Sequence, residues 1–137
     1  MPIEETAVPD ETKTLIYVVD DDASVREALK MLFISADMEV QTFELAEDFL
    51  KYKLREEKAC LISDIKMKGL SGLELQQQLA ERGIKIPVIF LTAFDSNEVR
   101  QQAKQAGAAG YFRKPVDDQA LLDTIQWALS RNSSSKE

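Results

Sequence analysis

The chain has 137 residues, 45% of them hydrophobic, which is enough for one domain with a core of its own. Its formal net charge of −7 argues against a domain that itself holds nucleic acid through the phosphates. Histidine is absent and Cys60 is the one cysteine, which excludes histidine-dependent hydrolysis, most zinc chemistry and an internal disulfide, and indicates a reducing, cytoplasmic environment.

The two ends of the chain are polar and without periodicity. Residues 1–13 predict a flexible N-terminal arm, and residues 132–137 predict a tail or the start of a linker, which leaves 14–131 as the folded domain. No apolar stretch reaches membrane-spanning length and no signal-peptide pattern begins the chain, so we expect no membrane association.

Between the ends, apolar segments of strand length alternate with amphipathic segments of helix length, the pattern of βαβ units. The first strand is expected at 14–19. A helix should follow from Ser24 as its N-cap, with Glu27 completing a capping box. The second strand, Glu39–Phe43, alternates in polarity as an edge strand does, and a helix is expected at about 45–53.

The second half of the chain continues this alternation. Strands are expected at 59–63, 88–91 and 110–112, and helices at about 73–82, 96–106 and 118–131. The first, third and fourth strands are continuously apolar, which predicts central positions in a parallel sheet. A five-stranded parallel sheet in the order 2-1-3-4-5 with five helices fits this pattern, with a crevice between the first and third strands.

Chemically active side chains follow the ends of these strands. Asp20 and Asp21 follow the first, Asp64 the third and Lys114 the fifth, while Thr92 stands where the fourth stops. Because parallel strands end at the same edge of a sheet, these side chains should gather in one crevice. Clustered carboxylates repel one another unless a cation lies among them, and oxygen ligands alone favour Mg²⁺, Mn²⁺ or Ca²⁺.

Such a crevice suits phosphoryl chemistry. A metal, a lysine and a hydroxyl can together neutralise the oxygens of a phosphoryl group, and a carboxylate can accept that group as an aspartyl phosphate. Asp64 is the best candidate for the acceptor because it stands alone on a central strand. Asp22 is expected to cap the first helix and to take no part in the site.

Several segments together resemble the receiver domain of bacterial two-component response regulators. They are Val18–Asp22, Asp64 with Met67, Ser71–Leu73, Leu91–Ala93, Gly107–Ala108 and Gly110–Pro115, and the resemblance covers roughly residues 14–130. It implies a flavodoxin-like (CheY-like) three-layer sandwich, and the order 2-1-3-4-5 is already known for that fold. Residues 43–50 and 71–75 are most similar to the FixJ-like subgroup, whose members usually carry a C-terminal helix-turn-helix domain that binds DNA.

The resemblance also implies roles for particular residues. Asp64 would accept the phosphoryl group from a sensor histidine kinase. The Mg²⁺ (or Mn²⁺) ligands would be Asp20, Asp21, Asp64 and the backbone carbonyl of Lys66. Thr92 and Lys114 would bind the phosphoryl group, Tyr111 would be the aromatic switch that follows Thr92, and the bond between Lys114 and Pro115 is often cis in the family.

A protein of this kind is a signalling switch that promotes only its own phosphorylation and dephosphorylation, and it is not a metabolic enzyme. Its expected output is the control of transcription. The surface made by the fourth helix, fifth strand and fifth helix could support a phosphorylation-dependent homodimer.

This chain departs from the family pattern in the loop after Asp64. Position 68 is normally proline, and Lys68 predicts a less rigid loop with a solvated lysine side chain. Lys66 and Phe94 occupy positions that tune the access of attacking water. A bulky Phe94 could slow hydrolysis of the phosphate or could have a simple packing role.

Three apolar side chains fall outside the predicted core. Met31 and Ile34 lie off the apolar stripe of the first helix, where they could dock the helices of a kinase or could be scattered exposed side chains. Trp127 lies opposite the apolar stripe of the last helix, where it could lie flat along the helix or belong to a dimer or interdomain interface, and we favour the interface.

Three other functions were weighed against a receiver domain. Aspartyl-phosphate phosphohydrolases carry a second aspartate two residues after the nucleophile, a position that Lys66 occupies here. A flavodoxin-like cofactor binder needs a phosphate-binding loop after the first strand, where three aspartates stand. A pseudo-receiver that only binds partners would lack one of the acids, the threonine or the lysine, and all of them are present.

Overall fold

A computed structural model describes residues 12–134, with side chains as far as residue 131. Most of the arm predicted at 1–13 (residues 1–11) and the last three residues of the predicted tail lie outside the described residues. Strands and helices alternate strictly, as expected. Their bounds are β1 Leu15–Val19, α1 Ala23–Ser35, β2 Glu39–Phe43, α2 Ala46–Leu50, β3 Ala59–Ser63, α3 Gly72–Glu81, β4 Val88–Thr92, α4 Asn97–Gln105, β5 Gly110–Arg113 and α5 Asp118–Ser134.

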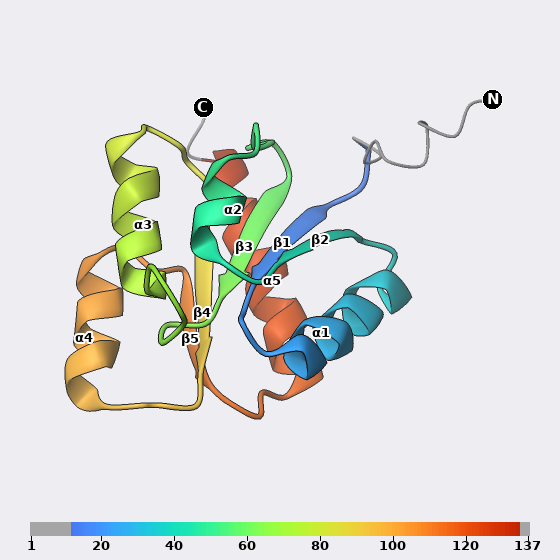
Figure 1. The fold of residues 1–137 in the computed structure, drawn as a ribbon. Coiled ribbons are helices and arrows are strands. Elements are labelled where there is room, and N and C mark those ends of the chain that lie inside the picture. The colour runs from blue at the N-terminus through green and yellow to red at the C-terminus, as the bar shows by residue number, and fades with distance from the viewer. Residues whose placement is uncertain (1–11, 135–137) are drawn as a thin grey trace.

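The five strands form one parallel sheet in the order β2-β1-β3-β4-β5 (Figure 1). β1, β3 and β4 are buried along their whole length, whereas β2 is mostly half-buried at an edge. The predicted strand order and the predicted central strands are therefore confirmed. Strands buried on both faces need apolar residues at every position, which is why these three are continuously apolar.

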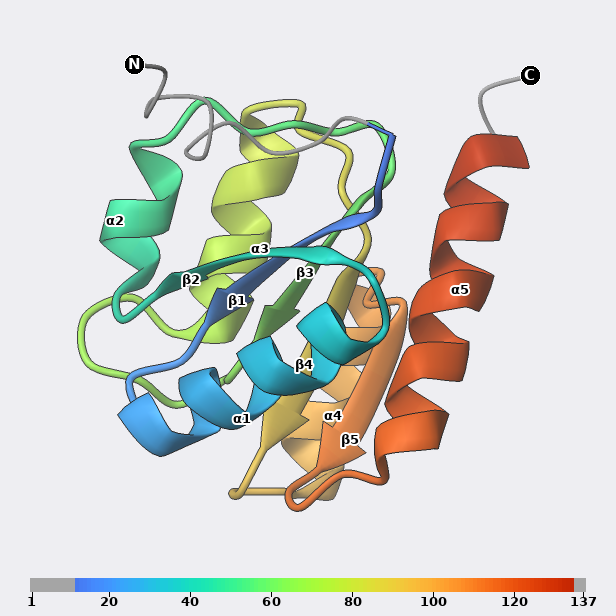
Figure 2. The same cartoon turned by 90° about the vertical axis from the view of Figure 1, so that its right-hand side faces the viewer.

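Helices cover both faces of the sheet. α1 and α5 lie on one face and α2, α3 and α4 on the other, which makes three layers (Figures 1 and 2). A hydrophobic core lies on each face of the sheet, and successive side chains of β1 point into the two cores alternately. Ile16 packs with Phe33 of α1, and Tyr17 packs with Phe49 of α2. Each such buried side chain stabilises the fold by about 1.5–3 kcal/mol, so both helical layers are held by the hydrophobic effect.

Three helix ends differ from the expectation. Asp22, and not Ser24, is the N-cap of α1: its side chain accepts hydrogen bonds from the backbone N–H groups of Ser24 and Val25, so Glu27 completes no capping box. The expectation that Asp22 caps this helix is confirmed. α2 ends at Leu50, before the predicted 53, and the chain then lays Tyr52 against the Phe43 ring, with 4.9 Å between centroids. α5 continues to Ser134, beyond the predicted end at 131.

Other expectations from the sequence can be compared with the structure. Cys60 is a free thiol buried on β3, and burial raises its pKa to about 12, so it is an unreactive core side chain. The peptide bond between Lys114 and Pro115 is cis, as the resemblance implied. Within residues 12–134, no helix combines the length and the apolar character needed to cross a membrane.

Candidate functional site

The site is built where the strands end. β1 and β3 pair so that Val19 lies beside Ser63, and the Asp64 N–H donates to the Val19 carbonyl at 3.0 Å. This register places the residues that follow the two strands side by side. One carboxyl oxygen from each of Asp20, Asp21 and Asp64 lies within 4.8 Å of the others, so the predicted gathering of the three acids is confirmed.

Lys114 lies between two of these carboxyl groups. Its Nζ donates to Asp20 Oδ2 at 2.8 Å and to Asp64 Oδ2 at 3.1 Å. Asp20 is 2% exposed and Asp64 8%, so these charge-assisted bonds are shielded from solvent. Three carboxyl groups thus share a single ammonium, which contacts only two of them, and a further cation would be stabilised among them.

The pKa values in the site reflect this imbalance of charge. Burial, and then the negative charge of Asp20, raise the pKa of Asp64 above its ordinary value, although Lys114 acts in the opposite direction. Burial lowers the pKa of Lys114, but its hydrogen bonds and charge pairing with Asp20 and Asp64 outweigh that effect and raise it overall. Lys114 therefore remains a cation, and Asp64 is ionised at an energetic cost.

Backbone N–H groups hold the other carboxyl oxygens. Asp20 Oδ1 accepts from the Asp22 N–H at 2.9 Å, and Asp64 Oδ1 accepts from the Ile65 N–H at 2.7 Å. Asp21 Oδ2 accepts from the Lys68 N–H at 3.1 Å, a bond that a proline at this position could not donate. The backbone of the loop after β3 thereby orients Asp21 and Asp64, and the backbone after β1 orients Asp20.

Within the described residues, the side chains of Lys66 and Lys68, in the loop after β3, form no hydrogen bond or ion pair with the buried acids. Both residues are exposed, and the Lys66 ammonium lies 4.9 Å from the centre of the Phe94 ring, itself 62% exposed. The role of the Lys66 carbonyl as a metal ligand stays a prediction.

Thr92 and Tyr111 stand on the neighbouring strands β4 and β5 but have different partners. Thr92 is fully buried at the end of β4, and its Oγ1 accepts from the Phe94 N–H at 3.0 Å. The half-buried Tyr111 donates to Asp95 Oδ1 at 3.0 Å, and the Arg100 guanidinium lies 4.8 Å from its ring centre. Because Asp95 also pairs with Arg100 at 2.8 Å, the Tyr111 hydroxyl is tied to the segment after β4.

This partner of Tyr111 was missed in the sequence. The hydrogen bond from Tyr111 lowers the pKa of Asp95, while burial and Asp95 raise the pKa of Tyr111. Both shifts favour the tyrosine as donor and the aspartate as acceptor. Asp95 stands three residues after Thr92, but nothing local to the sequence pairs it with a side chain on β5.

Close packing of α3 supports the end of β3. Gly72 is buried, and its N–H donates to the Ile65 carbonyl at 2.8 Å. A Cβ at Gly72 would overlap the Asp64 carbonyl oxygen and lie 3.0 Å from Ile65 Cα. A capping box between Ser71 and Glu74, which the sequence analysis also missed, begins this helix.

A mostly apolar groove borders the acid site. It has a volume of about 510 Å³ and runs between α1 and the segment after β5. Its lining residues are Val25, Ala28, Leu29, Leu32, Leu91, Lys114, Pro115, Val116 and Asp118. Met31 and Ile34 are 65% and 55% exposed on α1 but are not part of this lining.

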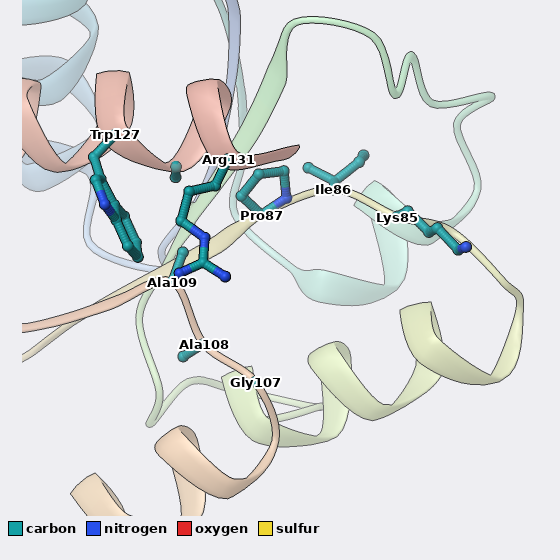
Figure 3. A pocket seen from close by; sticks show the side chains of 9 residues that line it. Lys85, Ile86, Pro87, Gly107, Ala108, Ala109, Trp127 and Arg131 are labelled. Carbon is teal, nitrogen blue, oxygen red and sulfur yellow. The ribbon is translucent and has the colours of Figure 1, made fainter. Parts of the chain in front are cut away.

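Trp127 borders a second pocket at the opposite end of the sheet. The indole is 51% exposed, and the Arg131 guanidinium lies 5.0 Å from its ring centre. The pocket, of about 460 Å³, is also lined by Pro87 before β4 and by residues 107–109 before β5 (Figure 3). Trp127 is therefore separated from the acids by the length of the strands.

Comparison with known proteins gives consistent matches. Residues 16–126 match the family described as "Response regulator receiver domain". The chain is 44% identical over 117 residues to the transcriptional regulatory protein TdiR of Thauera aromatica, which covers 85% of this chain and 52% of TdiR.

Solved structures match as well. The response regulator StyR superposes with a TM-score of 0.83 at 43% identity, over 90% of this chain and 63% of that one. FixJ-N superposes with a TM-score of 0.78 at 28% identity, over 85% of this chain and 94% of that one. The chain spans about half the length of the curated relatives it matches.

Proposed function

Because this chain belongs to the family of response regulator receiver domains, we propose that Asp64 accepts a phosphoryl group from a sensor histidine kinase and that this modification switches a partner-binding surface. One observation carries the proposal. Three carboxyl oxygens from Asp20, Asp21 and Asp64 lie within 4.8 Å of one another, and Lys114 bridges two of these groups. Such a cluster of acids favours a bound cation, and that cation together with Lys114 would offset the negative charge of a phosphoryl group.

Phosphoryl transfer would proceed by attack of an Asp64 carboxylate oxygen on the phosphorus of a phosphohistidine. The new P–O bond forms as the P–N bond breaks, and the imidazole of the kinase leaves with the electron pair. Lys114, which already donates to Asp64 Oδ2, is suited to donate to the oxygens of the transferred group.

Receiver domains bind Mg²⁺ at a cluster of aspartates, and the donor set here fits such an ion. The side chains of Asp20, Asp21 and Asp64, with the backbone carbonyl of Lys66, would hold Mg²⁺ or Mn²⁺. All four donors are oxygens, as a hard cation requires. When bound, the ion would supply positive charge beside the oxygens of the transferring group.

The switch would pass from Thr92 to Tyr111. The Thr92 hydroxyl, which now accepts from the Phe94 N–H, would turn to donate to the phosphoryl group on Asp64. The movement would open space beside β4, into which Tyr111 could turn once it leaves Asp95. The surface formed by α4, β5 and α5 would change with it.

The groove beside α1 suits the kinase. It is apolar and includes Lys114, so a phosphohistidine carried on a docked helix would lie close to Asp64. We include the exposed Met31 and Ile34 as an outer part of this docking surface. The α4–β5–α5 surface, with Trp127 nearby on α5, is our candidate for a phosphorylation-dependent homodimer.

In the cell, we propose a cytoplasmic signalling switch and not a metabolic enzyme. TdiR is named a transcriptional regulatory protein. By extension, the output would be control of transcription through a C-terminal helix-turn-helix domain outside this sequence. With its net charge of −7, the receiver domain itself would not bind the DNA.

Acetyl phosphate with Mg²⁺ tests the phosphoacceptor directly. By intact mass, the wild-type protein should gain one base-labile phosphoryl group, Asp64→Asn should gain none, and the exposed control Asp37→Asn should behave as wild type. A base-labile phosphate on Asp64→Asn would show that another residue is the acceptor.

Gel filtration with beryllofluoride, a mimic of the phosphoryl group, tests the phosphorylation-dependent homodimer. An elution volume that the mimic leaves unchanged would exclude this homodimer.

A further inference from the structure

Glu47 on α2 contacts the loop that joins β3 to α3. Its partner there is Leu70, which is 23 residues further along the chain. Glu47 Oε2 accepts a hydrogen bond from the Leu70 N–H at 3.3 Å. Its Oε1 is buried and, among the residues that the structure describes, has no hydrogen-bond partner. A buried polar atom without a partner destabilises a protein, so folding stability alone does not account for a glutamate here.

The loop is shaped to lie against this carboxyl group. Gly69 adopts a left-handed conformation with φ of 71°, which glycine allows without strain. A Cβ at Gly69 would collide with Oε2 of Glu47 and lie only 2.8 Å from Oε1 and 2.9 Å from Cδ. The loop backbone therefore packs directly on the Glu47 carboxyl group.

The other end of the same loop reaches the acids. The Lys68 N–H donates to Asp21 Oδ2 at 3.1 Å, and the Ile65 N–H donates to Asp64 Oδ1 at 2.7 Å. Residues 65–70 are thus held by the acid site on one side and by Glu47 on the other. The amide that binds Asp21 and the amide that binds Glu47, those of Lys68 and Leu70, are therefore only two residues apart on one loop.

We propose that Glu47 is a positioning residue of the phosphotransfer site: by holding the Leu70 N–H it fixes the backbone of residues 65–70 and so orients Asp21. The Lys66 carbonyl, our candidate metal ligand, lies in the same stretch. This inference rests on the proposed function, because it concerns the Mg²⁺ affinity of the same site. Without the Glu47 contact the loop samples several conformations, and Mg²⁺ binding must then select one of them.

The experiment compares Glu47→Met with Glu47→Gln. Methionine has a similar length but no acceptor for the Leu70 N–H, whereas glutamine keeps one carbonyl oxygen and the shape of the side chain. Glu44→Met removes an exposed carboxylate just before α2 and controls for the loss of one negative charge. Mg²⁺ affinity is measured by calorimetry, Leu70 amide exchange by NMR, and stability by urea unfolding in EDTA.

We expect Glu47→Met to weaken Mg²⁺ binding about five- to tenfold and to speed Leu70 exchange at least tenfold, with the urea midpoint in EDTA unchanged or higher. Glu47→Gln and Glu44→Met should stay within twofold of wild type in Mg²⁺ affinity. Wild-type Mg²⁺ affinity or wild-type Leu70 exchange in Glu47→Met would overturn the proposal. Both measurements need no phosphodonor, so a wild-type protein that took no phosphoryl group would refute the proposed function separately.

Discussion

Replacing Lys114 with methionine measures how strongly this lysine stabilises the acid site. The change removes two hydrogen bonds to buried carboxyl groups, of 2.8 Å to Asp20 and 3.1 Å to Asp64. Hydrogen bonds to charged groups contribute about 1.5–3 kcal/mol each. The lysine side chain is only 19% exposed, so its substitution also removes the free-energy cost of burying the ammonium, which offsets part of the loss. The net loss in the free energy of unfolding should lie near the lower end of the sum, at about 3 kcal/mol.

Mg²⁺ should restore much of this loss. Without the ammonium, the three carboxyl groups attract a divalent cation more strongly, so we expect the Mg²⁺ affinity to rise about tenfold, or about 1.4 kcal/mol. The loss in EDTA should also become smaller as the pH is lowered from neutral, because the raised pKa of Asp64 allows it to take up a proton, and lose its charge, at a higher pH than an ordinary aspartate.

Urea unfolding followed by circular dichroism is the assay, in EDTA and at saturating Mg²⁺. With a slope of about 2 kcal/mol per molar urea, the midpoint in EDTA should fall by about 1.5 M. Lys30→Met, an exposed lysine on α1, is the matched control and should shift stability by less than about 0.5 kcal/mol. If Lys114→Met unfolds like this control in EDTA, or binds Mg²⁺ no more tightly than wild type, the electrostatic account of the site is wrong.

Three further substitutions test other parts of the site. Burial and the charge of Asp20 raise the pKa of Asp64 in the folded state above its unfolded value, so the protein loses stability as the pH rises from the unfolded pKa through the folded pKa. Asp64→Asn should therefore raise the Tm in EDTA at neutral pH and flatten the pH dependence of the Tm. A lower Tm in this variant would contradict the argument. Gly72→Ala should lower the free energy of unfolding by about 1–3 kcal/mol in urea, since its Cβ overlaps the Asp64 carbonyl oxygen. Asp95→Ala should release Tyr111 and speed phosphorylation by acetyl phosphate several-fold, whereas an unchanged rate would show that this contact does not restrain the switch.

Much of the architecture could be read from local patterns. The continuous apolar runs of β1, β3 and β4 mark central strands, since only a strand covered on both faces needs apolar residues throughout. Helix ends were less predictable: Asp22 and Ser24 are both good N-caps, and the choice of Asp22 depends on where the chain turns after β1. Just after the early end of α2, Tyr52 packs on Phe43, a contact between separate elements that the local sequence does not indicate.

The sequence by itself determined the parallel sheet, its central strands and the meeting of Asp20, Asp21 and Asp64, because strand polarity places all carboxyl ends at one edge. Tertiary structure alone decided which groups hold Asp21, the loop after β3 and Tyr111. The contacts of Lys68 with Asp21, Glu47 with Leu70 and Tyr111 with Asp95 join segments between 16 and 47 residues apart. Hydropathy and helix propensity report on neighbours along the chain, whereas these contacts depend on strand register and on the path of loops packed against a neighbouring helix.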